Sequence, residues 1–153
     1  MKTVKKTQLS ICLILLALML SFIWGNSLLA APQSAELSGE VVGWLRRFLN
    51  WLPISEHLVR KLAHFGEFAC LGALFGWLFQ ILNQQSFHKF TMPLLAAFLA
   101  ALVDETLQVL TPERGPSVID VWIDSFGAAA GIALLYLGHC LWQRRKQTSN
   151  GGK

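Results

Sequence analysis

Four long apolar runs constrain this chain more than any other feature of its sequence. They extend over residues 9–31, 62–82, 92–110 and 119–142, and each is close to or above the roughly 20 residues with which a helix crosses the hydrocarbon core of a bilayer. Backbone groups in lipid must satisfy their own hydrogen bonds, so apolar segments of this length are expected to be helical. Charged residues make up 14% of the chain, well below the roughly 25% of soluble domains. The sequence therefore predicts an all-α membrane protein with four transmembrane helices.

A single membrane domain is expected over residues 9–142, between a short N-terminus at residues 1–8 and a tail at residues 143–153. The first run could alternatively be a cleaved signal peptide, because basic residues precede it. Its length and the lack of a small-x-small cleavage site favour retention as a membrane anchor. Cys12, Cys70 and Cys140 each lie in an apolar run without CxxC spacing, so we interpret them as small hydrophobic residues.

The distribution of basic residues predicts the orientation. Four helices place both termini on one side, together with the connection between the second and third helices. This side carries 8 of the 13 Lys and Arg residues, namely Lys2, Lys5, Lys6, Lys89, Arg144, Arg145, Lys146 and Lys153. The positive-inside rule therefore puts both termini in the cytoplasm. These basic residues flank helix ends and form no extended stripe, so we expect no nucleic-acid binding.

The longest connection, residues 32–61, is expected on the outer side. Hydrophobic residues recur at helical spacing between Ser34 and Trp51, with Arg46 and Arg47 off the apolar face. This pattern predicts an amphipathic helix in the outer membrane–water interface, or equally a helix that docks on the bundle. Ser55 is expected to cap the membrane helix that follows.

Ionisable side chains interrupt the apolar runs at one depth. The second helix begins, the third ends and the fourth begins on the outer side, so residues distant in sequence converge there. This predicted polar cluster comprises Lys61, His64, Glu67, Asp104, Glu105, Gln108, Arg114, Asp120 and Asp124. Ionisable groups at such depth should pair with one another, hold a cation, line water or be protonated, and they indicate a functional site by default. A satisfied structural network near the interface is the alternative.

One face of the fourth helix joins two of these carboxylates to two glycines. Asp120, Asp124, Gly127 and Gly131 follow i, i+4, i+7, i+11 spacing. The Gly-x-x-x-Gly step lets a second helix approach closely, so this face is expected to point into the bundle. The same glycines could instead mediate a homodimer.

The polar cluster contains no established catalytic motif. A metal ion is a weak option, with His64, Glu105 and Asp120 as the candidate ligands. An acid–base pair drawn from the same residues is a further option. The sequence names neither a nucleophile nor a cofactor.

Two stretches carry a resemblance to a known family. "RKLAHFGEFACLG" and "DETLQVLTPERGPSVIDVWIDSFGAAAG" resemble the VanZ-like family of small bacterial membrane proteins, and "FIWGNSLLAAPQSAELSGEVV" is similar to the family's first helix and its serine-bearing exit. Phe68 stands where Tyr is common, and Asp124 takes the aspartate option at an Asn/Asp position. The resemblance implies a multi-pass protein of the bacterial plasma membrane, in a family whose named member is linked to teicoplanin resistance. It implies no mechanism.

We therefore expect an envelope protein that binds an extracytoplasmic ligand at the polar cluster, beside membrane lipids. A lipid-linked wall precursor or a glycopeptide antibiotic would suit an outward cluster of mixed charge. The alternative is a membrane-embedded, metal-assisted enzyme that acts on a lipid or a lipid-linked precursor. A proton or ion pathway is less well supported, because the polar residues stop in the outer half of the membrane.

Overall fold

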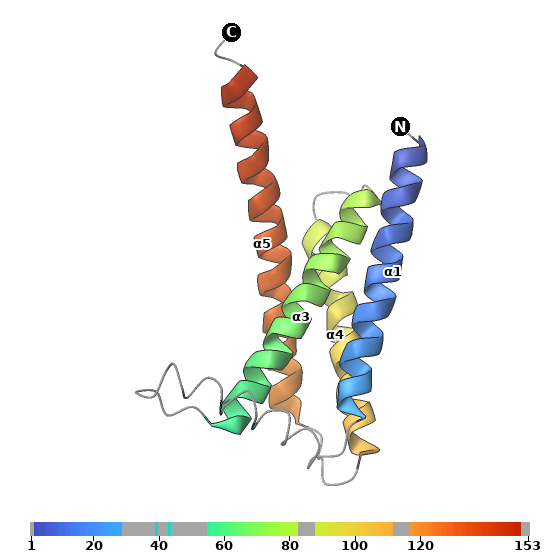
Figure 1. The fold of residues 1–153 in the computed structure, drawn as a ribbon, viewed down its shortest axis with the longest axis vertical. Helices are drawn as coiled ribbons and strands as arrows, with labels where there is room; N and C mark the ends of the chain where they lie inside the picture. The colour runs from blue at the N-terminus through green and yellow to red at the C-terminus, as the bar shows by residue number, and fades with distance from the viewer. Residues whose placement is uncertain are drawn as a thin grey trace.

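The computed structural model contains a bundle of four helices (Figure 1). It describes residues 2–28, 55–82, 88–111 and 117–150, together with Gly39 and Gly43. In chain order the helices are α1 (Lys2–Ser27), α3 (Glu56–Ile81), α4 (His88–Val109) and α5 (Val118–Asn150). The N- and C-terminal ends of the chain lie at the same end of the bundle (Figure 1). The helix predicted between Ser34 and Trp51, as well as Arg114, falls outside the described residues, Gly39 and Gly43 apart.

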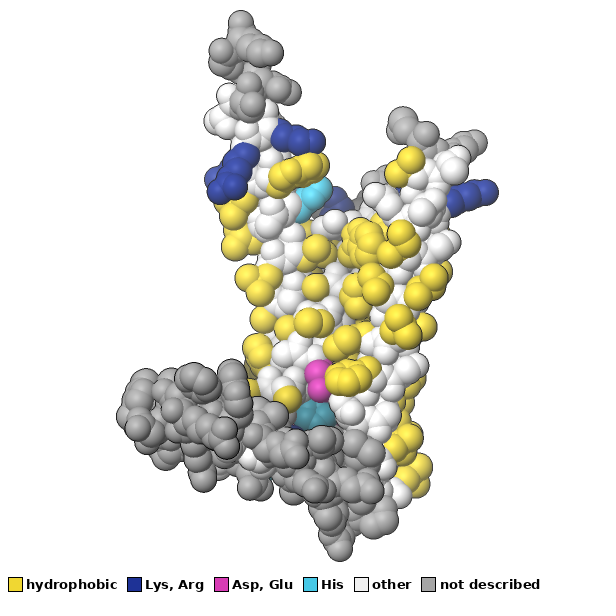
Figure 2. Space-filling view, in the orientation of Figure 1, with side chains coloured by type: hydrophobic (Ala, Val, Ile, Leu, Met, Phe, Trp, Pro, Cys, Tyr) yellow, Lys and Arg dark blue, Asp and Glu magenta, His cyan; other side chains and the backbone are white. Residues whose placement is uncertain are grey.

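All four helices are long and apolar enough to cross a membrane, over Thr3–Ser27, His57–Ile81, His88–Val109 and Val118–Thr148. Their outward surface carries many exposed large hydrophobic side chains, among them Leu18, Leu99 and Phe126. Figure 2 shows hydrophobic side chains along the whole length of the bundle. A soluble protein does not expose apolar surface on this scale. The predicted fold class is therefore confirmed, and the chain is a multi-pass membrane protein.

The helices extend beyond the apolar runs from which they were predicted. α3 begins six residues before Leu62, at Glu56, because the Oγ of Ser55 accepts a hydrogen bond from the amide of Leu58 at 3.2 Å. The predicted capping role of Ser55 is thus confirmed. α5 continues to Asn150 and protrudes past the other helices at the end where the two termini lie (Figure 1). Polar helix formers such as Arg and Lys sustain this last part, which an apolar pattern does not detect.

Small residues bring α3 and α5 into their close contact, which is the most extensive helix pair in the bundle. A Cβ added at Gly127 would overlap the carbonyl of Phe65, and one added at Gly131 would overlap the carbonyl of Ala69. Both glycines are buried. Gly127 and Gly131 are four residues apart on α5, and the residues that they approach on α3 are also four residues apart and follow in the same chain direction. The two helices therefore run parallel, as expected if both begin on the same side of the membrane.

The remaining core lies between α1, α3 and α4. Its buried members include Cys12, Leu16 and Ile23 on α1 and Phe68 and Leu71 on α3. On α4 the buried positions are small, with Ala97, Ala100 and Ala101 facing inward. This close packing brings the end of α1 next to the end of α4 and the start of α3, where the ionisable residues lie.

Candidate functional site

The ionisable side chains gather where α3 and α5 begin and where α1 and α4 end. Figure 2 shows an acidic side chain and a histidine toward this end of the bundle, while the clearly visible lysines and arginines lie toward the opposite end, near the termini, with another histidine. Asp124 lies within electrostatic range of Glu67, Asp104, Glu105 and Asp120. The described members of the predicted polar cluster thus share one region, which we call the polar end.

An ion pair occupies the most accessible part of the polar end. The Nζ of Lys61 on α3 lies 2.8 Å from Oδ1 of Asp120 on α5, and the two side chains are 27% and 36% exposed. Asp120 is in the first turn of α5, and its backbone amide donates a hydrogen bond to the Oγ of Ser117 at 3.3 Å. The pair therefore joins the beginnings of two parallel helices at a position that solvent or a ligand can reach.

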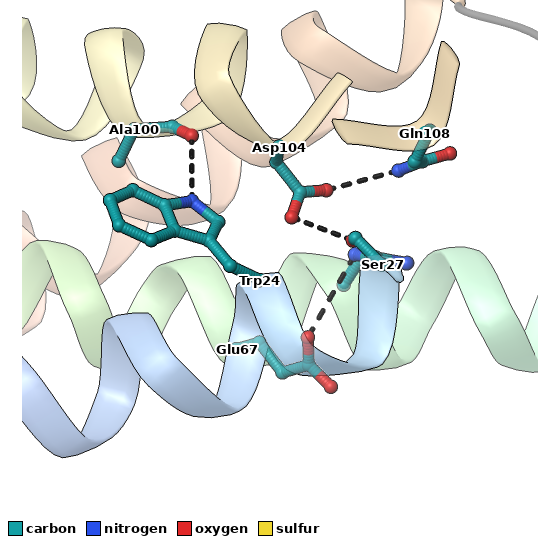
Figure 3. A network of polar contacts seen from close by, with 7 residues as sticks. Trp24, Ser27, Glu67, Ala100, Asp104 and Gln108 are labelled. Atoms are coloured by element: carbon teal, nitrogen blue, oxygen red, sulfur yellow. Dashed lines mark hydrogen bonds and ion pairs between the residues drawn. The ribbon is translucent and has the colours of Figure 1, made fainter. Parts of the chain in front are cut away.

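Asp104 is at the centre of a buried hydrogen-bond network (Figure 3). The Oγ of Ser27, the last residue of α1, donates to Oδ1 at 2.6 Å, and Nε2 of Gln108 donates to Oδ2 at 3.0 Å. Both Ser27 and Asp104 are 0% exposed. Nearby, the indole Nε1 of Trp24 donates to the carbonyl of Ala100 at 3.3 Å, so α1 is attached to α4 at two successive levels.

Sequence reasoning placed Asp104 and Gln108 in the cluster but missed Ser27. Asn26, which hydrogen bonds to Glu67, was missed as well. The available signal was the polar Asn-Ser pair that interrupts the end of the first apolar run. These two residues make α1 a contributor to the polar end rather than only an anchor.

Two glutamates complete the polar end. Oε2 of Glu105 accepts a hydrogen bond from the backbone amide of Ser117 at 2.7 Å, and this contact fixes α4 to the start of α5. Oε2 of Glu67 lies 3.8 Å from Nδ1 of His64, one turn earlier on α3. Glu105 is thus committed to a backbone contact, whereas Glu67 stands beside an imidazole.

His64, Asp104 and Asp124 come together from three helices. Each offers one possible metal-ligand atom, and these atoms all lie within 4.8 Å of one another. Of the metal ligands considered from sequence, His64 belongs to this trio, whereas Asp120 pairs with Lys61 and Glu105 bonds to Ser117. The backbone at Gly127 closely approaches the carbonyl of Phe65, the residue after His64, and this approach brings His64 and Asp124 together.

Comparison with known proteins adds one decisive observation. The VanZ/LLP1 family model matches residues 11–140, which is most of the chain. The chain belongs to the VanZ/LLP1 family. No curated protein and no solved structure matches it.

The part that matches the VanZ/LLP1 family model contains the whole polar end. It spans the carboxylates of α4 and α5, Lys61 and His64 of α3, and the Ser27 contact from α1. It ends before the part of α5 that carries Arg144, Arg145 and Lys146. The polar end is therefore part of the VanZ domain rather than of the protruding tail.

Proposed function

We propose that this VanZ-family protein acts in the bacterial plasma membrane with both termini in the cytoplasm, binds an extracytoplasmic envelope ligand at the polar end, and thereby contributes to glycopeptide resistance. The observation that carries the proposal is the accessible Lys61–Asp120 pair above a group of buried carboxylates. Buried ionisable groups inside a membrane protein are costly and are typical of substrate or ion sites.

The charge distribution supports an outward-facing polar end. Arg144, Arg145 and Lys146 lie near the end of α5 and Lys5 and Lys6 near the start of α1, which share the opposite end of the bundle. By the positive-inside rule that end is cytoplasmic. The polar end then opens to the cell exterior, where wall precursors and glycopeptides are found.

The ligand class follows from the neighbouring groups. An ammonium and a carboxylate at the mouth can bind groups of either charge. An apolar groove of about 400 Å³ lies between α4 and α5, and Trp122 is among its lining residues, on a different face of α5 from Asp120. Phe98 and Phe126 also line this groove. A polar mouth on a bundle with an apolar outer surface suits an amphiphile with a charged headgroup and an acyl chain. A lipid-linked wall precursor and the lipid-bearing glycopeptide teicoplanin both have this form.

The test is antibiotic susceptibility in a Gram-positive host that expresses the chain. We expect a higher minimal inhibitory concentration for teicoplanin, with a smaller change for vancomycin, which lacks an acyl chain. The double variant Lys61→Gln/Asp120→Asn removes both charges of the mouth and keeps their sum, and it is expected to lose the effect. Lys146→Gln changes a charge at the opposite end and is the matched control. All proteins are compared at equal membrane abundance.

A binding measurement separates ligand recognition from indirect effects on the envelope. Purified protein in lipid nanodiscs is titrated with teicoplanin and, separately, with a lipid-linked wall precursor. Binding of either compound that the Lys61→Gln/Asp120→Asn variant loses supports the proposal. Equal binding by the variant, or resistance that the variant keeps, would show that the mouth is not the site.

A further inference from the structure

The trio of His64, Asp104 and Asp124 supports an inference that goes beyond binding of an envelope ligand. We propose that these three residues bind one divalent transition-metal ion, for which Zn²⁺ is the best chemical match. Their possible ligand atoms lie within 4.8 Å of one another, and they come from α3, α4 and α5. Metal binding would hold whether or not the protein affects antibiotic susceptibility.

The donor set selects the type of metal. Zn²⁺ accepts imidazole nitrogen and carboxylate oxygen at about 2.0–2.2 Å, whereas Ca²⁺ and Mg²⁺ prefer oxygen ligands alone. Tetrahedral ligands at about 2.1 Å from a metal are about 3.4 Å apart. Atoms within 4.8 Å of one another therefore need to approach by up to about 1.4 Å when the ion binds.

The charge of the trio matches a divalent ion. Asp104 is 0% exposed and Asp124 is 1% exposed, so water screens neither carboxylate. Two carboxylates side by side in such a setting repel each other unless one of them is protonated or positive charge lies between them. A dipositive ion with two carboxylates and a neutral imidazole forms a site of zero net charge, which is the least costly arrangement at this depth.

The surroundings of the three side chains support their role as ligands. Oδ1 of Asp124 is buried and has no hydrogen-bond partner among the residues that the structure describes, and a buried carboxylate oxygen of this kind calls for a ligand. Ser27 and Gln108 hold Asp104 from either side, and a carboxylate oxygen can accept more than one contact. Oε2 of Glu67 lies 3.8 Å from Nδ1 of His64, which is too long for a hydrogen bond, so the carboxylate would orient the ring only after a small shift toward it.

Three protein ligands leave a fourth position for water or for a group of a bound molecule. This arrangement is typical of catalytic zinc sites, whereas structural sites use four protein ligands. The Lys61–Asp120 pair marks the accessible side, because Asp120 precedes Asp124 by one turn of α5. The metal would thus lie below the mouth, within reach of a polar headgroup bound there.

The experiment measures metal in the full-length protein. The protein carries a streptavidin-binding tag, since a polyhistidine tag would itself bind metal. It is purified in detergent, stripped with a chelator, incubated with Zn²⁺, desalted and analysed by elemental mass spectrometry. We expect about one Zn²⁺ per chain, at least a tenfold loss in Asp124→Asn, and full retention in Asp120→Asn, which removes a carboxylate one turn away on the same helix.

Substoichiometric zinc in the wild-type protein, below about a tenth of an equivalent, would overturn the proposal, as would equal zinc in wild type and a folded Asp124→Asn variant. If circular dichroism shows that this variant does not fold, the wild-type protein loaded with Co²⁺ decides. Intense visible absorption of tetrahedral Co²⁺ that Zn²⁺ displaces supports the site, and its absence refutes it. Because antibiotic susceptibility does not enter, metal binding and the proposed function can fail independently.

Discussion

Gly131→Ala tests whether the close contact of α3 and α5 determines stability. A Cβ at this position would lie 2.6 Å from the carbonyl carbon of Ala69 and 2.9 Å from its Cα. Carbon atoms pack at about 3.5–4.0 Å, so the two backbones must separate by about 1 Å. Backbone atoms cannot rotate away as a side chain can, and a gap of this size forfeits a quarter to a half of the dispersion attraction across it.

Overpacking costs about 1–3 kcal/mol, and the upper part of this range applies because the obstructing atoms belong to the backbone of Ala69. The better helix propensity of Ala returns up to about 1 kcal/mol, so the expected net effect is a destabilisation of about 1–2 kcal/mol. Gly138→Ala is the matched control on the same helix, because a Cβ there meets nothing within 4 Å. It is expected to be neutral or to stabilise by up to about 1 kcal/mol. The sign of the two substitutions should therefore differ.

Unfolding in mixed micelles with increasing sodium dodecyl sulfate, followed by far-ultraviolet circular dichroism, measures both variants. Gly131→Ala should unfold at a lower detergent fraction than wild type, and Gly138→Ala at the same or a higher one. Equal stability of Gly131→Ala and Gly138→Ala would refute the reasoning. It would show that the two helices can separate at no cost, and the glycine step would then have no role in packing.

Three further outcomes follow from the contacts. Ser27→Ala removes the donor to a buried carboxylate and should cost about 1–3 kcal/mol in the same assay; an unchanged midpoint would mean that water replaces the hydroxyl. Lys61→Met and Asp120→Asn should show a coupling of only about 0–1 kcal/mol in a double-mutant cycle, because the pair is partly exposed; a coupling above about 2 kcal/mol would contradict this. In a cysteine-free background, His57→Cys should react with a membrane-impermeant maleimide in intact cells, while Lys146→Cys should react only after permeabilisation, and the reverse pattern would invert the proposed orientation.

Hydropathy predicted the number of membrane helices because a segment in lipid must keep its backbone hydrogen bonded within a helix and present apolar side chains. Both requirements can be read from about 20 consecutive residues. It did not predict how far they continue. Beyond the bilayer, helix propensity and caps decide, so α3 begins at the residue after Ser55 and α5 runs to Asn150. These parts carry charged residues that an apolar window excludes.

Depth along the membrane placed the polar residues in one region, but depth does not specify rotation about each helix. Asp104 and Glu105 are adjacent in sequence and point to different partners, because neighbouring residues on a helix are about 100° apart. Asp104 contacts Ser27 of α1, whereas Glu105 contacts the amide of Ser117. The pairing of these residues therefore depended on how the helices pack, which the pattern of one sequence does not encode.

The Gly-x-x-x-Gly step was the exception, because its chemistry specifies a face as well as a depth. Gly127 and Gly131 were expected either inside the bundle or in a homodimer, and both lie buried against α3. Both glycines already contact α3 of the same chain, so a homodimer would have to form through another surface.

The parallel contact between α3 and α5 both packs the two helices and positions the ionisable side chains of the polar end. The glycine that lets the backbones touch at Phe65 lies three residues from Asp124, and Phe65 follows His64 directly. A substitution at this glycine would disturb the polar end without contacting any ligand, and in a genetic screen it would be indistinguishable from loss of a ligand-binding residue. Variation that tunes preference for the proposed ligand is thus expected at the partly exposed Lys61–Asp120 mouth, where side chains can change without altering the helix spacing.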